Sequence, residues 1–412
     1  MKILLINNFH YRKGGSETVY FNMARILAQH GHEVVFFSCT APQNESEGAN
    51  RHFIAPNNTL PMVKGAVRYI YNKEAQRSLE ELIAEEQPDI AHIHLFWGGL
   101  STSILDTLRR HHIPVVHTAH DYRMVCPAYT FRRADGTICE ECKGGRHYNC
   151  LKHRCSRNSI AHSLLMTAEM YLRNCYHKAL RKIDGIVFVS RFAHDKHLEF
   201  MPQLAQTKSV VSYNTVSPLP ERFISTKRGG YYLFFGRLSY EKGIKTLIEA
   251  FTKLNGPKLK IVGTGPEEEN LKAYVAEHRA EQSIEFVGYR KGDELKELIR
   301  DASFVIVPSE WYENNPMTII EAYTAGVPVI GARIGGIPEI IVEGGTGYLF
   351  QSGDVEALKG AVLQAESIPD EEYRQMSAEA RRFAAENFNE ERNYNQLMQF
   401  YKQIISQCQA RE

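Results

Sequence analysis

The sequence predicts an α/β protein of two domains, each built on a doubly wound parallel sheet. Its 412 residues are too many for one ordinary hydrophobic core. Short apolar runs alternate along the chain with segments of helical spacing, the pattern of parallel sheets covered by helices. The two halves also differ in character. Residues 1–215 hold 26 Lys and Arg against 19 Asp and Glu, with 16 of the 17 His and 7 of the 8 Cys, whereas residues 216–412 hold 23 against 29.

The composition is that of a soluble globular protein, with 43% hydrophobic and 24% charged residues. No run approaches the roughly 20 apolar residues that span a bilayer. The apolar run after Met1-Lys2 ends at Asn7, so we expect no signal peptide and a cytoplasmic protein. The basic first half suits an anionic partner. Residues 58–77 combine apolar and basic side chains at helical spacing, which fits either contact with the inner face of a membrane or an ordinary surface helix.

The first half begins with a strand at residues 2–6, which leads through Gly14-Gly15 into a helix that extends to Gln29. The glycines permit a close approach of the backbone to a ligand, but they do not form the G-x-G-x-x-G motif, so a nicotinamide cofactor is disfavoured. His120 comes just after another predicted strand, residues 113–118, where an imidazole can bond a sugar hydroxyl or move a proton.

A cysteine-rich segment, residues 126–155, interrupts this pattern. Its cysteines follow the spacing C-x12-C-x2-C-x7-C-x4-C in a polar stretch with little apolar content to fold around. Such a loop needs a staple, C-x2-C is typical of tetrahedral zinc, and a reducing compartment favours metal over disulfides. Free thiols or a redox pair are the alternatives. We predict a structural Zn²⁺ at Cys126, Cys139, Cys142 and Cys155, with Cys150 as the substitute for one of them.

In the second half, each predicted strand ends in glycine, a basic residue or a carboxylate. The strands are expected at residues 231–235, 259–262, 284–287, 304–307 and 327–331. The candidate ligand-binding residues that follow them are Arg237, Lys242, Gly265, Gly288, Arg290 and Glu313. Because the carboxyl ends of parallel strands share one edge of a sheet, we expect these residues to surround one ligand. A guanidinium and an ammonium group would suit a diphosphate.

The second half is organised around Glu313 to Glu321, which opens a helix after the strand at residues 304–307. Asn315 suits the N-cap and Pro316 the first helical position. The helix N-terminus is a place for a phosphate, whereas the two carboxylates suit neutral hydroxyls of a ribose or sugar ring. A ligand with both phosphates and hydroxyls is a nucleotide-sugar.

Together these motifs resemble the retaining glycosyltransferases of family four, over nearly the whole chain. The motifs are Gly14-Gly15-Ser16-Glu17, His120, Gly236-Arg237-x4-Lys242-Gly243, and Glu313-x7-Glu321 before Gly326-Val327-Pro328-Val329. The resemblance implies the GT-B fold, in which two Rossmann-like domains face a cleft and a C-terminal helix returns to the first domain. The implied parts are the first domain, 1–214, with the insertion 126–155, the linker 215–228, the second domain 229–387, and the returning helix 388–412.

The resemblance also implies roles for individual residues. Arg237 and Lys242 would bind the donor diphosphate and stabilise its departure, Glu321 would hold the ribose, and Glu313 and His120 would contact the donor sugar. The catalytic set would be His120, Glu313, Arg237 and Lys242. Further substrate contacts would come from Gly15, Gly265, Gly288, Arg290, Asn315, Met317 and Thr318. No Asp-x-Asp motif occurs, which fits catalysis without a divalent metal.

By this resemblance, the donor would be a UDP- or GDP-sugar and the acceptor a glycan or lipid-linked glycan of a cell-surface polysaccharide. Alanine at Glu321 or Lys242 should then abolish transfer with little loss of stability. An epimerase or phosphorylase of the same fold is the first alternative. A zinc-containing nucleic-acid-binding protein is a remote one, because the cysteine-rich segment lacks a basic reading helix, so we expect no nucleic-acid partner.

Overall fold

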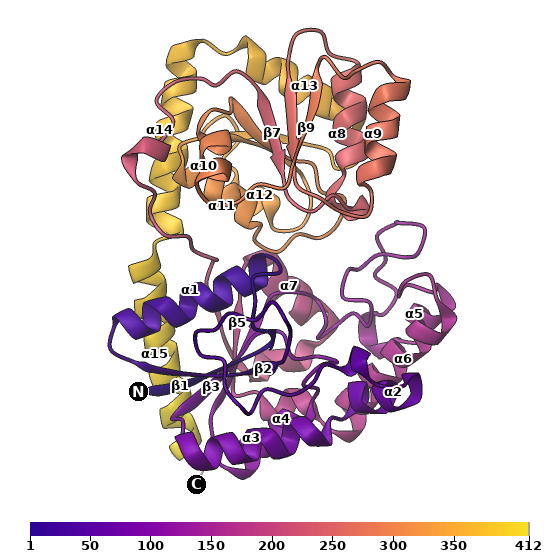
Figure 1. Cartoon of the computed structure of the whole chain (residues 1–412), viewed down its shortest axis with the longest axis vertical. Helices are drawn as coiled ribbons and strands as arrows, with labels where there is room; N and C mark the ends of the chain where they lie inside the picture. The colour runs from indigo at the N-terminus through magenta and orange to yellow at the C-terminus, as the bar shows by residue number, and fades with distance from the viewer. Residues whose placement is uncertain (411–412) are drawn as a thin grey trace. The chain divides into compact units, whose positions relative to one another are not determined.

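The computed structural model describes residues 1–410 and divides into two compact units. The first comprises Met1–Tyr213 and the C-terminal residues from Glu391, and the second comprises Asn214–Glu390. Each unit is built on a six-stranded parallel sheet (Figure 1). The predicted α/β architecture of two doubly wound sheets is therefore confirmed. Within the described chain, no helix is long and apolar enough to cross a membrane.

The first sheet has the order β2-β1-β3-β4-β5-β6. Its strands are β1 (Lys2–Phe9), β2 (Glu33–Cys39), β3 (Ile90–Ile93), β4 (Val115–Ala119), β5 (Gly185–Phe188) and β6 (Lys208–Val211). The α-helices of this unit are α1 (Gly15–Gln29), α2 (Met62–Ile70), α3 (Lys73–Glu86), α4 (Ser103–Arg110), α5 (Asn149–Lys152), α6 (Ile160–Tyr171), α7 (Arg191–Phe200) and α15 (Glu390–Gln409). The central strands are apolar because helices cover both faces of the sheet.

Helix α15 packs on the first sheet, far from its own position in the sequence. Its residues Phe400, Tyr401 and Ile404 belong to the same buried core as Ile3 and Leu5 of β1. The packing is close at Gly185 of β5, where an added Cβ would lie 2.8 Å from Phe400 Cζ. The predicted return of the C-terminal helix to the first domain is confirmed by this packing.

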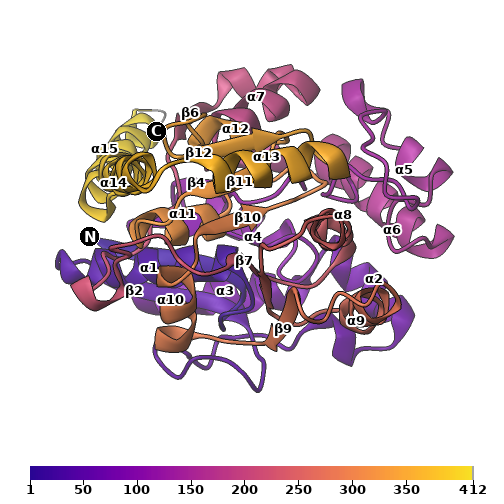
Figure 2. The same ribbon diagram turned by 90° about the horizontal axis from the view of Figure 1, so that it is seen from above.

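The second sheet has the order β12-β11-β10-β7-β8-β9. Its strands are β7 (Tyr232–Phe235), β8 (Leu259–Val262), β9 (Ile284–Gly288), β10 (Phe304–Val307), β11 (Val329–Ala332) and β12 (Gly347–Phe350). Its α-helices are α8 (Ile244–Thr252), α9 (Glu268–Glu277), α10 (Gly292–Arg300), α11 (Met317–Thr324), α12 (Ile337–Ile340), α13 (Val355–Ser367) and α14 (Asp370–Asn387). Helix α8 packs against α13, and α11 packs against α14 (Figure 2).

The strand orders locate the place in each unit where a ligand is expected. In the second unit the chain proceeds outward from β7 to β9, then returns to β10 on the other side of β7. In the first unit the corresponding reversal lies between β1 and β3. Open α/β sheets bind ligands beyond the carboxyl ends of the strands at such a switch point. A ligand is therefore expected at the loops after β7 and β10, and at those after β1 and β3.

Candidate functional site

The loops after β7 and β10 are held together at the switch point of the second unit. Gly243, which precedes α8, has φ +68°, and a Cβ there would lie 1.9 Å from the carbonyl oxygen of Pro308. Only glycine combines this backbone conformation with so close an approach. The Glu310 N–H also donates to Glu241 O at 2.9 Å, and Thr246 Oγ1 donates to Glu310 Oε1 at 2.6 Å. These contacts fix one loop relative to the other.

In this arrangement, Lys242 forms an ion pair with Glu313. Lys242 Nζ donates to Glu313 Oε1 at 2.7 Å, and Ser309 Oγ donates to the same oxygen at 2.8 Å. Glu313 is only 6% exposed. Burial by itself would raise its pKa, but the charge and hydrogen bond of Lys242 outweigh burial and hold the pKa of Glu313 below its usual value. Glu313 is therefore a carboxylate that is charged, buried and fixed in place.

The backbone around Glu313 is held as firmly as its side chain. Gly335, in the loop after β11, has φ +59°, and a Cβ there would lie 2.4 Å from Glu313 O. The N–H of Gly336 donates to that oxygen at 2.7 Å. A third loop of the sheet thus reaches the same point, as the pattern of glycines predicts.

Asn315 is buried and connects this site to the start of the unit. Its Oδ1 accepts from the Asn214 N–H at 2.7 Å, and Asn214 Nδ2 donates to Asn315 O at 2.9 Å. Because Oδ1 is used in this way, Asn315 does not cap α11. The helix begins at Met317 with Pro316 at the N-cap, one residue later than predicted. Among the described residues, Asn315 Nδ2 has no hydrogen-bond partner, so a buried donor is left beside Glu313.

Helix α11 presents a narrow accessible stripe. Its residues that are not fully buried are Met317, Thr318, Glu321 and Thr324. The spacing puts them on one side of the helix, and the others pack into the core. Burial raises the pKa of Glu321 to about 7. Glu321 therefore differs from Glu313, because its charge changes near neutral pH.

Arg237 lies exposed at the end of β7, next to the glycine turns of the neighbouring loop. Gly265 is in contact with that turn, since an added Cβ would lie 2.2 Å from Leu238 O. The N–H of Gly263 in turn donates to Gly288 O at 3.0 Å, so the loops after β7, β8 and β9 are joined in series. The predicted substrate-binding glycines thus support one another across the sheet edge.

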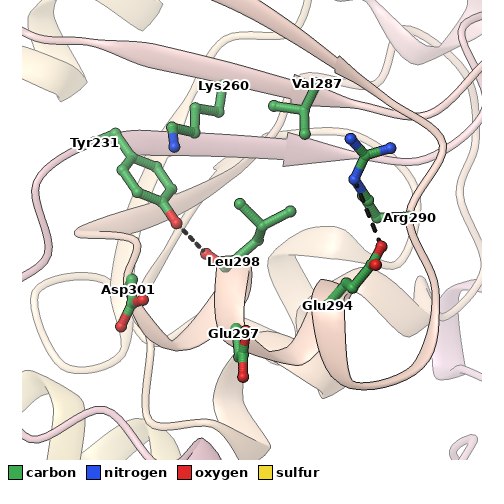
Figure 3. Close-up of a pocket in the computed structure, with 8 residues that line it drawn as sticks. All are labelled: Tyr231, Lys260, Val287, Arg290, Glu294, Glu297, Leu298 and Asp301. Carbon is green, nitrogen blue, oxygen red and sulfur yellow. Dashed lines mark hydrogen bonds and ion pairs between the residues drawn. The ribbon is translucent and has the colours of Figure 1, made fainter.

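Arg290 lines a pocket of about 310 Å³ between the sheet and α10 (Figure 3). The pocket is lined by Tyr231, Lys260, Val287, Arg290, Glu294, Glu297, Leu298 and Asp301. Arg290 is paired with Glu294 there at 3.6 Å, and Tyr231 Oη donates to Leu298 O at 2.8 Å. Arg290 is the one predicted site residue that lines this pocket. Lys242, Glu313 and Glu321 do not line it, so this pocket is distinct from the site at the switch point.

In the first unit, α1 begins at Gly15 directly after the loop that follows β1. Gly14 and Gly15 are exposed, and a helix N-terminus of this kind suits an anion, although the buried Glu17 carboxylate already accepts from its own backbone N–H in the first turn. The loop after β3 is bonded to the end of β1, because Asn7 Oδ1 accepts from Leu95 N–H at 2.9 Å and Asn8 Oδ1 accepts from Leu100 N–H at 3.0 Å. The switch point is therefore ordered in this unit too.

His120 is half-buried at the end of β4 and belongs to a row of stacked histidines. Its Nε2 lies 2.8 Å from His94 Nδ1, and the ring of His94 stacks on that of His92 at 4.9 Å. Burial, followed by the charge of His117, lowers the pKa of His120 to about 3. His120 is therefore neutral at physiological pH and suits hydrogen bonding to a hydroxyl. Sequence reasoning missed His94, because its contact with His120 crosses between two strands.

In the cysteine-rich segment, several thiols lie near one another, but they are not arranged as metal ligands. Burial and then the charges of Cys126, Cys155 and Cys139 raise the pKa of Cys142, so these four thiols lie within electrostatic reach. Among the described residues, no group of three or more potential ligands is placed to hold a metal ion. The zinc site therefore stays a prediction.

The structure thus brings Lys242, Glu313 and Asn315 together, with Ser309 as an addition. Ser309 and Asn214 were missed by sequence reasoning. Ser309 lies two residues after a strand end, which is the one signal that was available. Gly15 and His120 belong to the first unit, and their surroundings are described within that unit alone.

Comparison with known proteins agrees with this geometry. A family model described as "Glycosyltransferase Family 4" matches residues 13–218, half of the chain, and one described as "Glycosyl transferases group 1" matches residues 220–383. The chain belongs to glycosyltransferase family 4. Its two sheets are the two domains of the GT-B fold, as the sequence resemblance implies.

This family 4 glycosyltransferase is similar to several characterised and uncharacterised proteins. It is 24% identical over 402 residues to an N-acetyl-α-D-glucosaminyl L-malate synthase of Bacillus anthracis, covering 95% of this chain and 94% of that protein. It is 25% identical over 360 residues to an uncharacterised 42.6 kDa protein of the cps region of Klebsiella pneumoniae, covering 82% and 87%. The structure of HepE from Anabaena in complex with UDP matches with a TM-score of 0.65 at 16% identity, covering 98% and 100%.

The ion pair changes the stability expected for a Lys242 variant. Lys242→Ala leaves Glu313 buried and unpaired, so we expect a loss of about 2 kcal/mol, below the range for fully buried pairs because Lys242 is partly exposed. This replaces the expectation of little loss. Thermal unfolding measures the effect, and Lys242→Met with Glu313→Gln should recover most of it. An unchanged melting temperature in Lys242→Ala would refute the role of the pair.

Glu321→Gln should raise stability relative to wild type progressively as pH rises above about 4.5. Folding raises the pKa of Glu321 to about 7, so the wild type loses stability as pH rises from about 4.5 through 7, where the buried group must ionise. The glutamine variant avoids this cost. We expect it to be more stable than wild type by roughly 2 kcal/mol at pH 8 and equal to it at pH 4.5. Parallel pH-dependence in the two proteins would contradict the assignment.

Proposed function

We propose that this chain is a retaining transferase that moves a sugar from a UDP- or GDP-sugar to a glycan or lipid-linked glycan during cell-surface polysaccharide synthesis. The observation that carries the proposal is the ion pair of partly exposed Lys242 with buried Glu313 at the switch point, next in the chain to helix α11 and its titratable Glu321. Cations and N–H groups suit phosphates, and carboxylates suit hydroxyls. A nucleotide-sugar is the ligand that needs both.

Within the second unit, different side chains bind the diphosphate, the ribose and the sugar of the donor. Arg237 and Lys242 bind the diphosphate and stabilise the negative charge that it gains on leaving. Glu321 accepts hydrogen bonds from the ribose hydroxyls. Glu313, charged and fixed, accepts them from the sugar, and Asn315 Nδ2 is the donor available beside it.

For the first unit, the family resemblance assigns the backbone at Gly15 to the diphosphate and His120, which is neutral, to the sugar. The proposal includes no covalent nucleophile and no catalytic metal, since phosphate departure assisted by two basic side chains supplies the charge stabilisation.

Several relatives support the donor and the pathway. The Anabaena HepE structure is a complex with UDP, and the Klebsiella pneumoniae relative is named for a cps region. A glycosyltransferase of Salmonella typhimurium that is 28% identical over 177 residues bears a putative assignment to colanic acid synthesis. These relatives favour a nucleotide donor and a polysaccharide product.

A thermal-shift panel of nucleoside diphosphates and their sugars tests the proposal directly, since ligands that bind the native state raise its melting temperature. We expect UDP or GDP to stabilise the wild type and to lose at least tenfold in affinity in Glu321→Ala. Transfer should be abolished in both Glu321→Ala and Lys242→Ala. Lys245→Ala, which removes an exposed ammonium one turn away, is the matched control and should be active.

Two results would overturn the function. Retained transfer in both Glu321→Ala and Lys242→Ala would refute the proposed donor site. Conversion of the donor without any acceptor would instead indicate an epimerase.

We also propose that Cys126, Cys139, Cys142 and Cys155 hold a structural Zn²⁺, with Cys150 as the substitute for one of them. The electrostatic reach of these thiols around Cys142 supports it. Burial raises the pKa of Cys126 to about 11, and the backbone N–H groups of Phe131, Ala128 and Tyr129 that bond its Sγ oppose this rise. A site closed by four thiolates is structural and does not activate water.

Elemental analysis of protein purified without chelator tests the zinc proposal. We expect about one zinc per chain, and its loss in Cys139→Ser with Cys142→Ser. Cys175→Ser, which changes an exposed cysteine outside the segment, is the control and should retain the metal. Less than about half a zinc per chain in the wild type would contradict the site, and a Cys150–Cys155 disulfide in the mass spectrum would replace it.

A further inference from the structure

Helix α6 carries an apolar stripe on its exposed side. Ile160 and Leu164 are more than half exposed, and beyond the end of the helix Leu172 is 40% and Tyr176 77% exposed. The opposite side of α6 is also apolar, because Met166 and Met170 are buried in the domain. A surface helix normally keeps only one apolar face, which it turns inward. The outward stripe therefore has no role in the fold of the domain.

Helix α2 extends this apolar surface. Its residues Met62, Val63 and Val67 are exposed, and Met62 is 86% so. Tyr69 Oη donates to Met166 Sδ at 3.1 Å, so α2 lies beside α6, as both views show (Figures 1 and 2). We call the exposed apolar residues of the two helices, with Leu172 and Tyr176, the α2–α6 face. Exposed apolar residues gathered on one face indicate an interaction surface.

Basic residues border the α2–α6 face. Between residues 146 and 182 the exposed basic side chains are Arg146, Lys152, Arg154, Arg157, Lys178 and Arg181. The one acidic residue in that range, Glu169, is buried and lies 3.6 Å from Arg173. The nearby Asp106 is bonded by Lys182. The border of the face is therefore positively charged, with no exposed carboxylate of its own between residues 146 and 182.

We propose that the α2–α6 face docks on the surface of an anionic lipid bilayer. Apolar side chains ringed by Lys and Arg suit the boundary between acyl chains and negative headgroups, where a protein lies on the membrane without crossing it. A second copy of the chain is a poorer occupant, because two such faces would bring like charges together. The inference rests on the proposed function in one respect, which is that docking would bring the enzyme to a lipid-linked acceptor.

Sedimentation with vesicles tests the docking. We expect the full chain to bind vesicles of phosphatidylcholine with 30% phosphatidylglycerol at least tenfold better than pure phosphatidylcholine, and the difference to shrink in 0.5 M salt. Ile160→Asn with Leu164→Asn should lose at least tenfold in binding to the anionic vesicles. Leu363→Asn, which changes a 49% exposed leucine on α13 of the second unit, is the matched control and should bind as wild type.

A charge variant separates the two components of the face. Arg154→Gln with Arg157→Gln should weaken binding to anionic vesicles and leave weak binding to neutral vesicles unchanged. Nucleotide binding, measured by thermal shift, should be unchanged in all these variants, so a failure of docking is distinguishable from a failure of the proposed function. Equal binding of wild type and the Ile160/Leu164 variant to anionic vesicles would overturn the proposal. If the wild type were a dimer and Ile160→Asn with Leu164→Asn were a monomer, the α2–α6 face would instead bind a second copy of the chain.

Discussion

The second unit depends on one interaction, the ion pair between Lys242 and Glu313. A buried carboxylate loses most of its hydration and is costly to bury without a partner. Lys242 and Ser309 supply that partner, but only because Gly243 lets the loop after β7 approach the loop after β10. The electrostatics of the site are therefore set by two backbone approaches, at Gly243 and Gly335, that no side chain larger than hydrogen would allow.

The two glutamates of the site illustrate opposite ways of treating a buried charge. Glu313 is paired with Lys242, so its pKa is lowered and it is ionised well below neutral pH. Glu321 is not compensated in this way, and its pKa of about 7 makes its charge responsive to its surroundings. Hydroxyl donors that arrive at Glu321 would stabilise the carboxylate and lower its pKa. A bound ribose would therefore favour the ionised form of Glu321, whereas Glu313 is ionised without a ligand.

The sequence was sufficient for the architecture and for the loops that matter. Apolar runs mark the strands, and glycine, a basic residue or a carboxylate follows each predicted strand of the second half, so the prediction rests on a repeated pattern. What the sequence lacked were contacts between distant segments. The Asn214 N–H donates to the side-chain oxygen of Asn315, which is therefore not used to cap α11. The helix starts one residue later than the sequence predicts, although asparagine is a favoured N-cap residue. His94 was likewise invisible, because only the sheet brings it to His120. Ser309 is just four residues from Glu313, but it lies in an irregular loop whose conformation the sequence pattern does not specify.

The first unit shows why an outward apolar surface calls for a functional explanation. Its core is already complete, since β1, α1 and the returning α15 bury their apolar residues together. The exposed side chains of α2 and α6 contribute nothing to that core and leave apolar area in water, which is unfavourable in the isolated chain. An arrangement that costs stability in water and is surrounded by positive charge is explained if the chain works at an anionic apolar boundary. The exposed basic residues near the α2–α6 face are Lys and Arg, whose charge does not change near neutral pH.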